Sequence, residues 1–170
     1  GCRVIHAVDG PSTLTRCGRI TIGIVSVVWS LVGFTIAFGT DAGSLIGGLD
    51  FIGLNGVEGD FLLFMVFQMM FAIITPALIS GAVAERMKFS AWVLFTTLWA
   101  LIVYPIVAHW AFSADGWMYA WGVRDFAGGL VVHINAGIAA LALVFALGPR
   151  RGFGAEEMKP HSVPLTLIGT

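Results

Sequence analysis

The chain is poor in charge: only 11% of its 170 residues are Asp, Glu, Lys or Arg, whereas a soluble domain has roughly 25%. Four long stretches contain none of these residues, namely 20–40, 61–84, 89–114 and 126–149. A helix of about 20 apolar residues crosses a bilayer core of ~30 Å, and each stretch is long enough. The shortage of charge excludes a soluble globule, a disordered tail and a secreted disulfide scaffold. It predicts an all-α polytopic membrane protein.

Cysteine is also scarce, since the chain has two. Cys2 and Cys17 match no metal or disulfide spacing, so we expect free thiols. The net charge of −1 gives no reason to expect nucleic acid as a partner. The sequence contains no metal-ligand cluster, nucleophile–base pair or cofactor motif, and the glycine-containing loop before Lys159 lacks the spacing of a phosphate-binding loop. We therefore expect no enzyme, no cofactor and no metal.

Basic residues are nearly absent from every second connection between the apolar runs. Eight of the nine lie on alternate sides: Arg3, Arg16, Arg19, Arg86, Lys88, Arg150, Arg151 and Lys159, with Arg124 as the exception. Basic connections stay in the cytoplasm, so the N-terminal segment is predicted to be cytoplasmic. The runs do not alternate in polarity as barrel strands do, which favours helices. The connection 41–60 contains six glycines, which predicts irregular structure or short turns.

Polar side chains inside a span are costly and usually face protein or a pore. Gln68, His109, His133 and Asn135 are of this kind. His109 is interpreted as a buried structural hydrogen bonder, and Asn135 as a bond between helices.

Asp125 stands where the fourth span starts, and Asp is a good helix N-cap. His133 follows eight residues later, about 12 Å deeper in a continuous helix. Helical spacing would place Asp125, Gly129, His133, Ala136 and Ala140 on one face. This face is either a packing surface with one hydrogen-bonded histidine or the wall of a pore, and the spacing leaves both open.

Aromatic residues recur in two of the spans. Phe67 and Phe71 are i, i+4 neighbours, a spacing typical of core or lipid-facing positions. Trp110 and Phe112 lie at the end of the third span, where an aromatic group normally anchors a helix at the membrane interface.

The stretch DFAGGLVVHINAGIAALALVFALGPRRGF, with ISGAVAERMKFSA before it and KPHSVPLTLIGT after it, resembles the ammonium transporter family (Amt/Mep/Rh), and its Amt branch most. The resemblance runs from about Trp29 to Thr170. It implies a fragment of a fold with about eleven spans in two inverted halves, here the second to fifth spans and the start of the sixth at 163. We therefore divide the chain into an N-terminal segment 1–19, of doubtful authenticity, and a partial transporter domain 20–170.

The resemblance also implies roles for single residues. Phe71 falls at the gate phenylalanine, Phe67 lines the vestibule above it, and Asp125 shapes the site that recruits ammonium. His133 corresponds to the first of two pore histidines, which relay a proton while ammonia crosses. The family commonly has tryptophan where this chain has Phe112, so we expect weaker cation–π binding there, unless Trp110 compensates.

Several alternatives stay open within this resemblance. Some relatives report ammonium as sensors, others are Rh-type ammonia channels, and a fragment of this length could also be non-functional. The resemblance further implies a homotrimer in the cell membrane and a possible PII-type regulatory protein on the cytoplasmic face.

Overall fold

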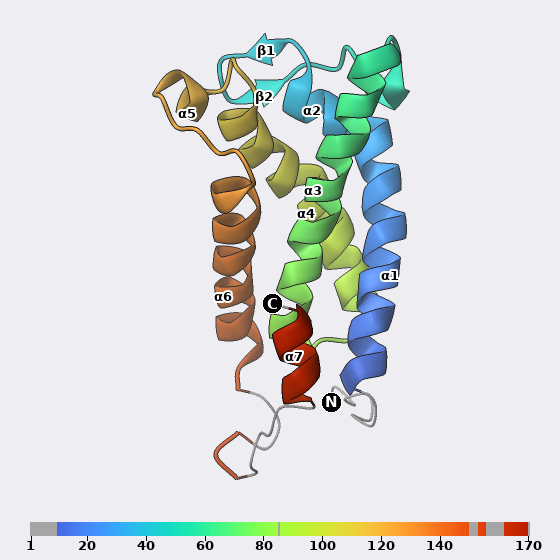
Figure 1. The fold of residues 1–170 in the computed structure, drawn as a ribbon, viewed down its shortest axis with the longest axis vertical. Helices are drawn as coiled ribbons and strands as arrows, with labels where there is room; N and C mark the ends of the chain where they lie inside the picture. Colours follow the sequence, from blue (N-terminus) through green and yellow to red (C-terminus); the bar gives the residue numbers. More distant parts are fainter. Residues whose placement is uncertain (1–9, 85, 150–152, 156–161, 170) are drawn as a thin grey trace.

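The computed structural model describes residues 10–84, 86–149, 153–155 and 162–169. Its long helices run side by side along the long axis of the molecule (Figure 1). Four segments are long and apolar enough to cross a membrane: Arg16–Phe38, Gly59–Val83, Phe89–Ala120 and Gly129–Leu147. The predicted all-helical polytopic fold is thereby confirmed. Residues 1–9 and the basic residues Arg150, Arg151 and Lys159, which the predicted orientation uses, lie outside the described residues.

The first span is one continuous helix built from three segments. It comprises α1 (Gly10–Val28), a π-helical turn η1 (Trp29–Gly33) and α2 (Phe34–Phe38). Gly33 is needed in the π turn, because a Cβ there would lie 2.9 Å from the ring of Trp29. The Trp29 indole is buried and donates a hydrogen bond of 3.3 Å to the carbonyl of Met65. This bond ties the first span to the second.

The second and third spans form the centre of the bundle. They are α3 (Gly59–Val83) and α4 (Phe89–Phe112), and α4 is followed by the short α5 (Trp117–Ala120). α3 packs against both α1 and α6, and α4 packs against α1 and α2. Tyr104 of α4 is fully buried, and its ring centroid lies 5.7 Å from that of Trp29 and 6.2 Å from that of Trp99.

The fourth span starts later than its charge-free run suggests. It begins with a π-helical segment η3 (Gly129–Ile134) and continues as α6 (Asn135–Leu147). Gly128 has a φ of 83°, a left-handed conformation that ends the preceding turn and suits glycine. The C-terminal α7 (Val163–Gly169) follows.

The connection 41–60 is more regular than the sequence suggests. β1 (Asp41–Ala42) and β2 (Ile46–Gly47) form an antiparallel hairpin, followed by the 3-10 turn η2 (Ile52–Leu54). Gly47 allows the hairpin to lie directly on α2, because a Cβ there would be 2.6 Å from the carbonyl oxygen of Thr35. The hairpin and α5 lie at the same end of the bundle (Figure 1), which we call the hairpin end.

Candidate functional site

Three phenylalanines gather between α3 and α4. The ring of Phe71 lies 5.2 Å from that of Phe67 and 5.8 Å from that of Phe112, both in edge-to-face geometry. Phe67 is 57% exposed, and the other two rings are half-buried. Such rings pack well edge to face, while their exposed faces can attract a cation. We call this group the phenylalanine cluster.

Asp125 holds the start of the fourth span against this cluster. Its Oδ2 accepts hydrogen bonds from the backbone N–H groups of Leu130 at 2.9 Å and Val131 at 2.8 Å. The predicted capping is confirmed, although the residue preceding the helix is Gly128. A Cβ at Gly128 would lie 3.5 Å from the Phe71 ring, so the capped helix start lies directly beside the cluster.

His133 lies nearer the helix start than predicted. The helix begins at Gly129, so the continuous helix from Asp125, on which the predicted depth of about 12 Å rested, is not formed, and His133 is the fifth residue of η3. Asp125 lies outside the helix and so does not belong to the predicted single face. The π-helical turn changes the angular spacing on which that face was based.

The other polar residues of the spans differ in whether their buried polar atoms have hydrogen-bond partners. His109 is fully buried, with Nδ1 2.9 Å from the carbonyl of Ala37 and Nε2 3.1 Å from Oδ1 of Asp41, which confirms it as a structural hydrogen bonder. The amide nitrogen of Asn135 and Oε1 of Gln68 are buried without a hydrogen-bond partner among the described residues. The bond between helices predicted for Asn135 is therefore not made through that nitrogen.

Trp110 does not reinforce the phenylalanine cluster. Its indole N–H donates to the carbonyl of Leu45 at 2.8 Å, and its ring lies 5.7 Å from that of Trp117. Two residues apart on an α-helix is a rotation of about 200°, so Trp110 points away from Phe112.

The hairpin end is acidic. It carries Asp41, Asp50, Glu58, Asp60 and Asp115, and Arg124 lies in the segment that leads from α5 to η3. The Arg124 guanidinium lies 4.1 Å from the centroid of the Tyr119 ring. The backbone N–H of Ser44, followed by His109, lowers the pKa of Asp41, and the backbone N–H of Thr40 lowers the pKa of Asp50. These carboxylates are therefore ionised at neutral pH, and such a surface attracts cations.

Across the residues that the structure describes, no group of three His, Cys, Asp or Glu side chains could hold a metal ion. Cys17 is buried and free, as expected, while Cys2 lies outside the described part of the chain.

The four long apolar helices define a multi-pass helical membrane protein. Residues 17–170 match the family model described as Ammonium Transporter Family. The chain belongs to this family.

Known relatives and solved structures agree with this assignment. The chain is 47% identical over 150 residues to ammonium transporter Amt1 of Archaeoglobus fulgidus, covering 88% of the chain and 38% of the relative. It superposes on the crystal structure of Saccharomyces cerevisiae Mep2 with a TM-score of 0.82 at 34% identity, covering 92% of the chain and 38% of that structure. It also superposes on a structure titled Sensor Amt Protein with a TM-score of 0.78 at 35% identity, covering 89% of the chain and 41% of that structure. The chain thus spans somewhat over a third of the length of its relatives.

Proposed function

We propose that the chain is part of a protein that carries ammonium or ammonia across a membrane and that is not an enzyme. The family membership supports this transport function. The observation that carries the proposed site is the contact of the phenylalanine cluster with the helix start that Asp125 caps. Ammonium is recruited there by the faces of Phe67, Phe71 and Phe112 together with the nearby carboxylate.

The chemistry of the substrate argues for deprotonation on the way. An unpaired ion in an apolar medium costs tens of kcal/mol in an idealised estimate, whereas cation–π contacts return only about 0.5–2 kcal/mol each. Ammonium therefore gives up its proton, and neutral ammonia passes His133. An imidazole both accepts and donates a proton, so His133 and a second histidine elsewhere in the full protein accept this proton and pass it on in the direction of transport.

The orientation and assembly follow from the same proposal. The acidic hairpin end faces outward, where its charge concentrates ammonium, and the N-terminal segment 1–19 is cytoplasmic. The partial transporter domain is 20–170. The full protein forms a homotrimer in the cell membrane, and its cytoplasmic face is a docking surface for a PII-type regulatory protein.

Growth of yeast tests the function directly. The full-length parent gene is expressed in a strain without its own ammonium uptake, with Asp125→Ala and His133→Ala as variants. We expect growth on low ammonium from the wild type and none from either variant, with all three proteins present in the membrane. Growth of both variants at the wild-type rate would contradict the proposed site.

A sensor is a second candidate, because the chain is 35% identical to the structure titled Sensor Amt Protein and 34% identical to the Saccharomyces cerevisiae Mep2 structure. A sensor would bind ammonium without supporting growth. A full-length protein that is correctly inserted, binds ammonium and gives no growth would favour this candidate over transport. A Rh-type ammonia channel would support growth but would move no net charge.

A further inference from the structure

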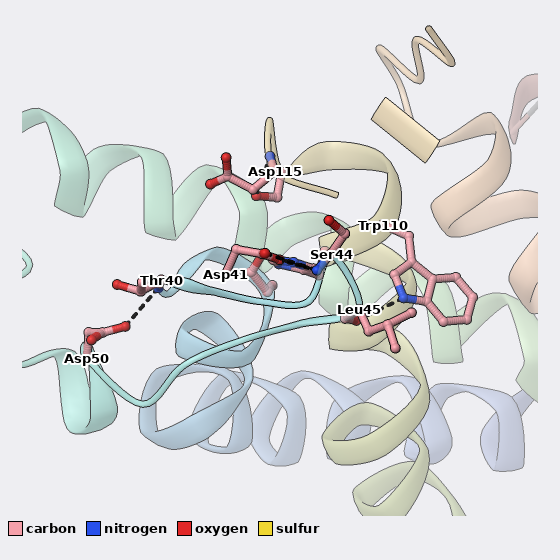
Figure 2. A network of polar contacts seen from close by, with 10 residues as sticks. Thr40, Asp41, Ser44, Leu45, Asp50, Trp110 and Asp115 are labelled. Carbon is pink, nitrogen blue, oxygen red and sulfur yellow. Dashed lines mark hydrogen bonds and ion pairs between the residues drawn. The ribbon is translucent and has the colours of Figure 1, made fainter. Parts of the chain in front are cut away.

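A polar contact joins two segments that are 68 residues apart at the hairpin end. The buried ring of His109, in the last turn of α4, lies between two oxygen atoms. Nδ1 is 2.9 Å from the carbonyl of Ala37 near the end of α2, and Nε2 is 3.1 Å from Oδ1 of Asp41 on β1. Figure 2 shows Asp41 in the surrounding network, in which it also binds the backbone N–H of Ser44.

Both neighbours of the ring are hydrogen-bond acceptors. A backbone carbonyl can only accept a hydrogen bond, and so can an ionised carboxylate. The pKa of Asp41 is lowered, first by the Ser44 N–H, so its carboxylate is ionised. The ring therefore bridges the Ala37 carbonyl, one residue from the end of α2, and the Asp41 carboxylate on β1.

This contact lies one turn before the site residue Phe112. The last turn of α4 runs from His109 to Phe112, and the backbone N–H of Ser113 closes it on the carbonyl of His109 at 3.3 Å. A Cβ at Gly116 would collide with that carbonyl oxygen, so the chain also turns back tightly against the same residue. Helix ends fray unless something holds them.

Two further bonds attach the hairpin to this part of the chain. The indole of Trp110 donates to Leu45, as Figure 2 shows, and the backbone N–H of Trp117 donates to the carbonyl of Ser44 at 3.3 Å. The hairpin is therefore bound on both sides of the turn that carries Phe112.

We infer that Asp41 and His109 are a positioning pair, which holds the last turn of α4 so that Phe112 stays packed against Phe71. The inference rests on the proposed function in that the phenylalanine cluster is taken as the recruitment site. The pair is not part of the phenylalanine cluster and is not proposed to bind the substrate. It acts through the backbone between His109 and Phe112.

The test compares Asp41→Ala, Asp41→Asn and Asp115→Asn in the full-length protein, reconstituted in vesicles. Asp115→Asn is the matched control, because it removes an exposed negative charge from the same end of the molecule (Figure 2) without touching His109. Asp41→Asn can keep the bridge, since an amide accepts from Ser44 through oxygen and has N–H groups that can donate to Nε2 of His109. Ammonium uptake is measured over a range of concentrations.

We expect Asp41→Ala to raise the half-saturating ammonium concentration about five- to tenfold with little change in the maximal rate. Asp41→Asn should restore most of the affinity, and Asp115→Asn should stay within twofold of the wild type. An unchanged half-saturating concentration in Asp41→Ala, or an equal shift in Asp115→Asn, would overturn the positioning role.

Hydrogen exchange separates this inference from the proposed function. Asp41→Ala should speed exchange at the backbone amides of Ser113 and Trp117, whereas the Asn variants should not. If the wild-type protein takes up no ammonium, the proposed function fails, and exchange still decides whether the pair holds the helix end. Unchanged exchange in Asp41→Ala would refute the inference by itself.

Discussion

α4 and α6 both lack Asp, Glu, Lys and Arg, yet the chain buries them differently. In the span that contains α4, 39% of the most apolar stretch is buried within the chain. In the span that contains α6, the corresponding share is 17%. α4 contributes the buried Tyr104 and His109, while η3 and α6 expose His133 together with Ile134 and Ile138. Apolar composition therefore identifies a span without saying what surrounds it. An exposed histidine in such a span is costly in lipid, so we expect protein or a pore beside it.

The largest effect on stability should come from the buried helix. Tyr104→Ala removes a ring that packs between Trp29 and Trp99. We expect the full-length protein to lose about 3–5 kcal/mol of unfolding free energy, as for other buried aromatic truncations. Leu94→Ala is the control, since Leu94 lies on the same helix with 61% of its surface exposed. Denaturation in detergent measures both, and equal losses would show that burial within this chain does not set the difference between the spans.

Two substitutions of Asp125 distinguish its role as a helix cap from the role of its negative charge. Asp125→Ala removes both hydrogen bonds to the backbone and should cost about 1–2 kcal/mol. Asp125→Asn keeps one oxygen, and a single oxygen accepts both bonds in the structure. We therefore expect near wild-type thermal stability from Asp125→Asn, with ammonium uptake reduced several-fold. Full uptake by this variant would mean that the carboxylate acts as a cap alone.

A substitution of Phe112 should have a smaller effect, which is confined to the affinity for ammonium. Tryptophan binds cations better than phenylalanine, and cation–π contacts are worth about 0.5–2 kcal/mol. Phe112→Trp should lower the half-saturating ammonium concentration about two- to fivefold, measured by uptake into vesicles. Phe89→Trp is the control, because it makes the same change at the other end of α4, and it should leave the concentration unchanged. A shift of similar size in the control would mean that the change does not act through the phenylalanine cluster.

The hairpin should respond to acid by a small, local loosening. The pKa values of Asp41 and Asp50 are lowered in the folded chain, so their stabilisation is complete above the unfolded pKa near 3.9 and is lost as the pH falls through the folded values. Pepsin cleavage around Leu45 should therefore rise as the pH is lowered from about 4 to about 2. In an Asp41→Ala, Asp50→Ala double variant, cleavage should be high already at pH 4 and should change less.

The spans could be predicted because their cause is local: charge-free runs, spacing within one helix and the capping preference of Asp125. The pairing of His109 with Asp41 could not, because it joins residues 68 apart through a hairpin that depends on close contact at Gly47. The late start of the fourth span was missed for a similar reason. The sequence carries no periodic signal for a π-helical turn, and the left-handed Gly128 is one of several glycines in the chain.

Of the candidate site, the contact of Phe67 with Phe71 follows from their i, i+4 spacing, whereas the contact of Phe71 with Phe112 needs the packing of α3 on α4. The direction of Trp110 depends on its bond to Leu45. Such contacts between elements are set by the fold and are not visible in the spacing of either helix.

The central claim is that ammonium is stripped of its proton and that ammonia passes His133. It is tested most directly with purified full-length protein in vesicles, by following charge movement and internal pH after an ammonium pulse. We expect saturable uptake by the wild type, loss of the proton-coupled signal in His133→Ala, and little change in Ile138→Ala on the same exposed helix. A His133→Ala signal equal to the wild type would contradict it.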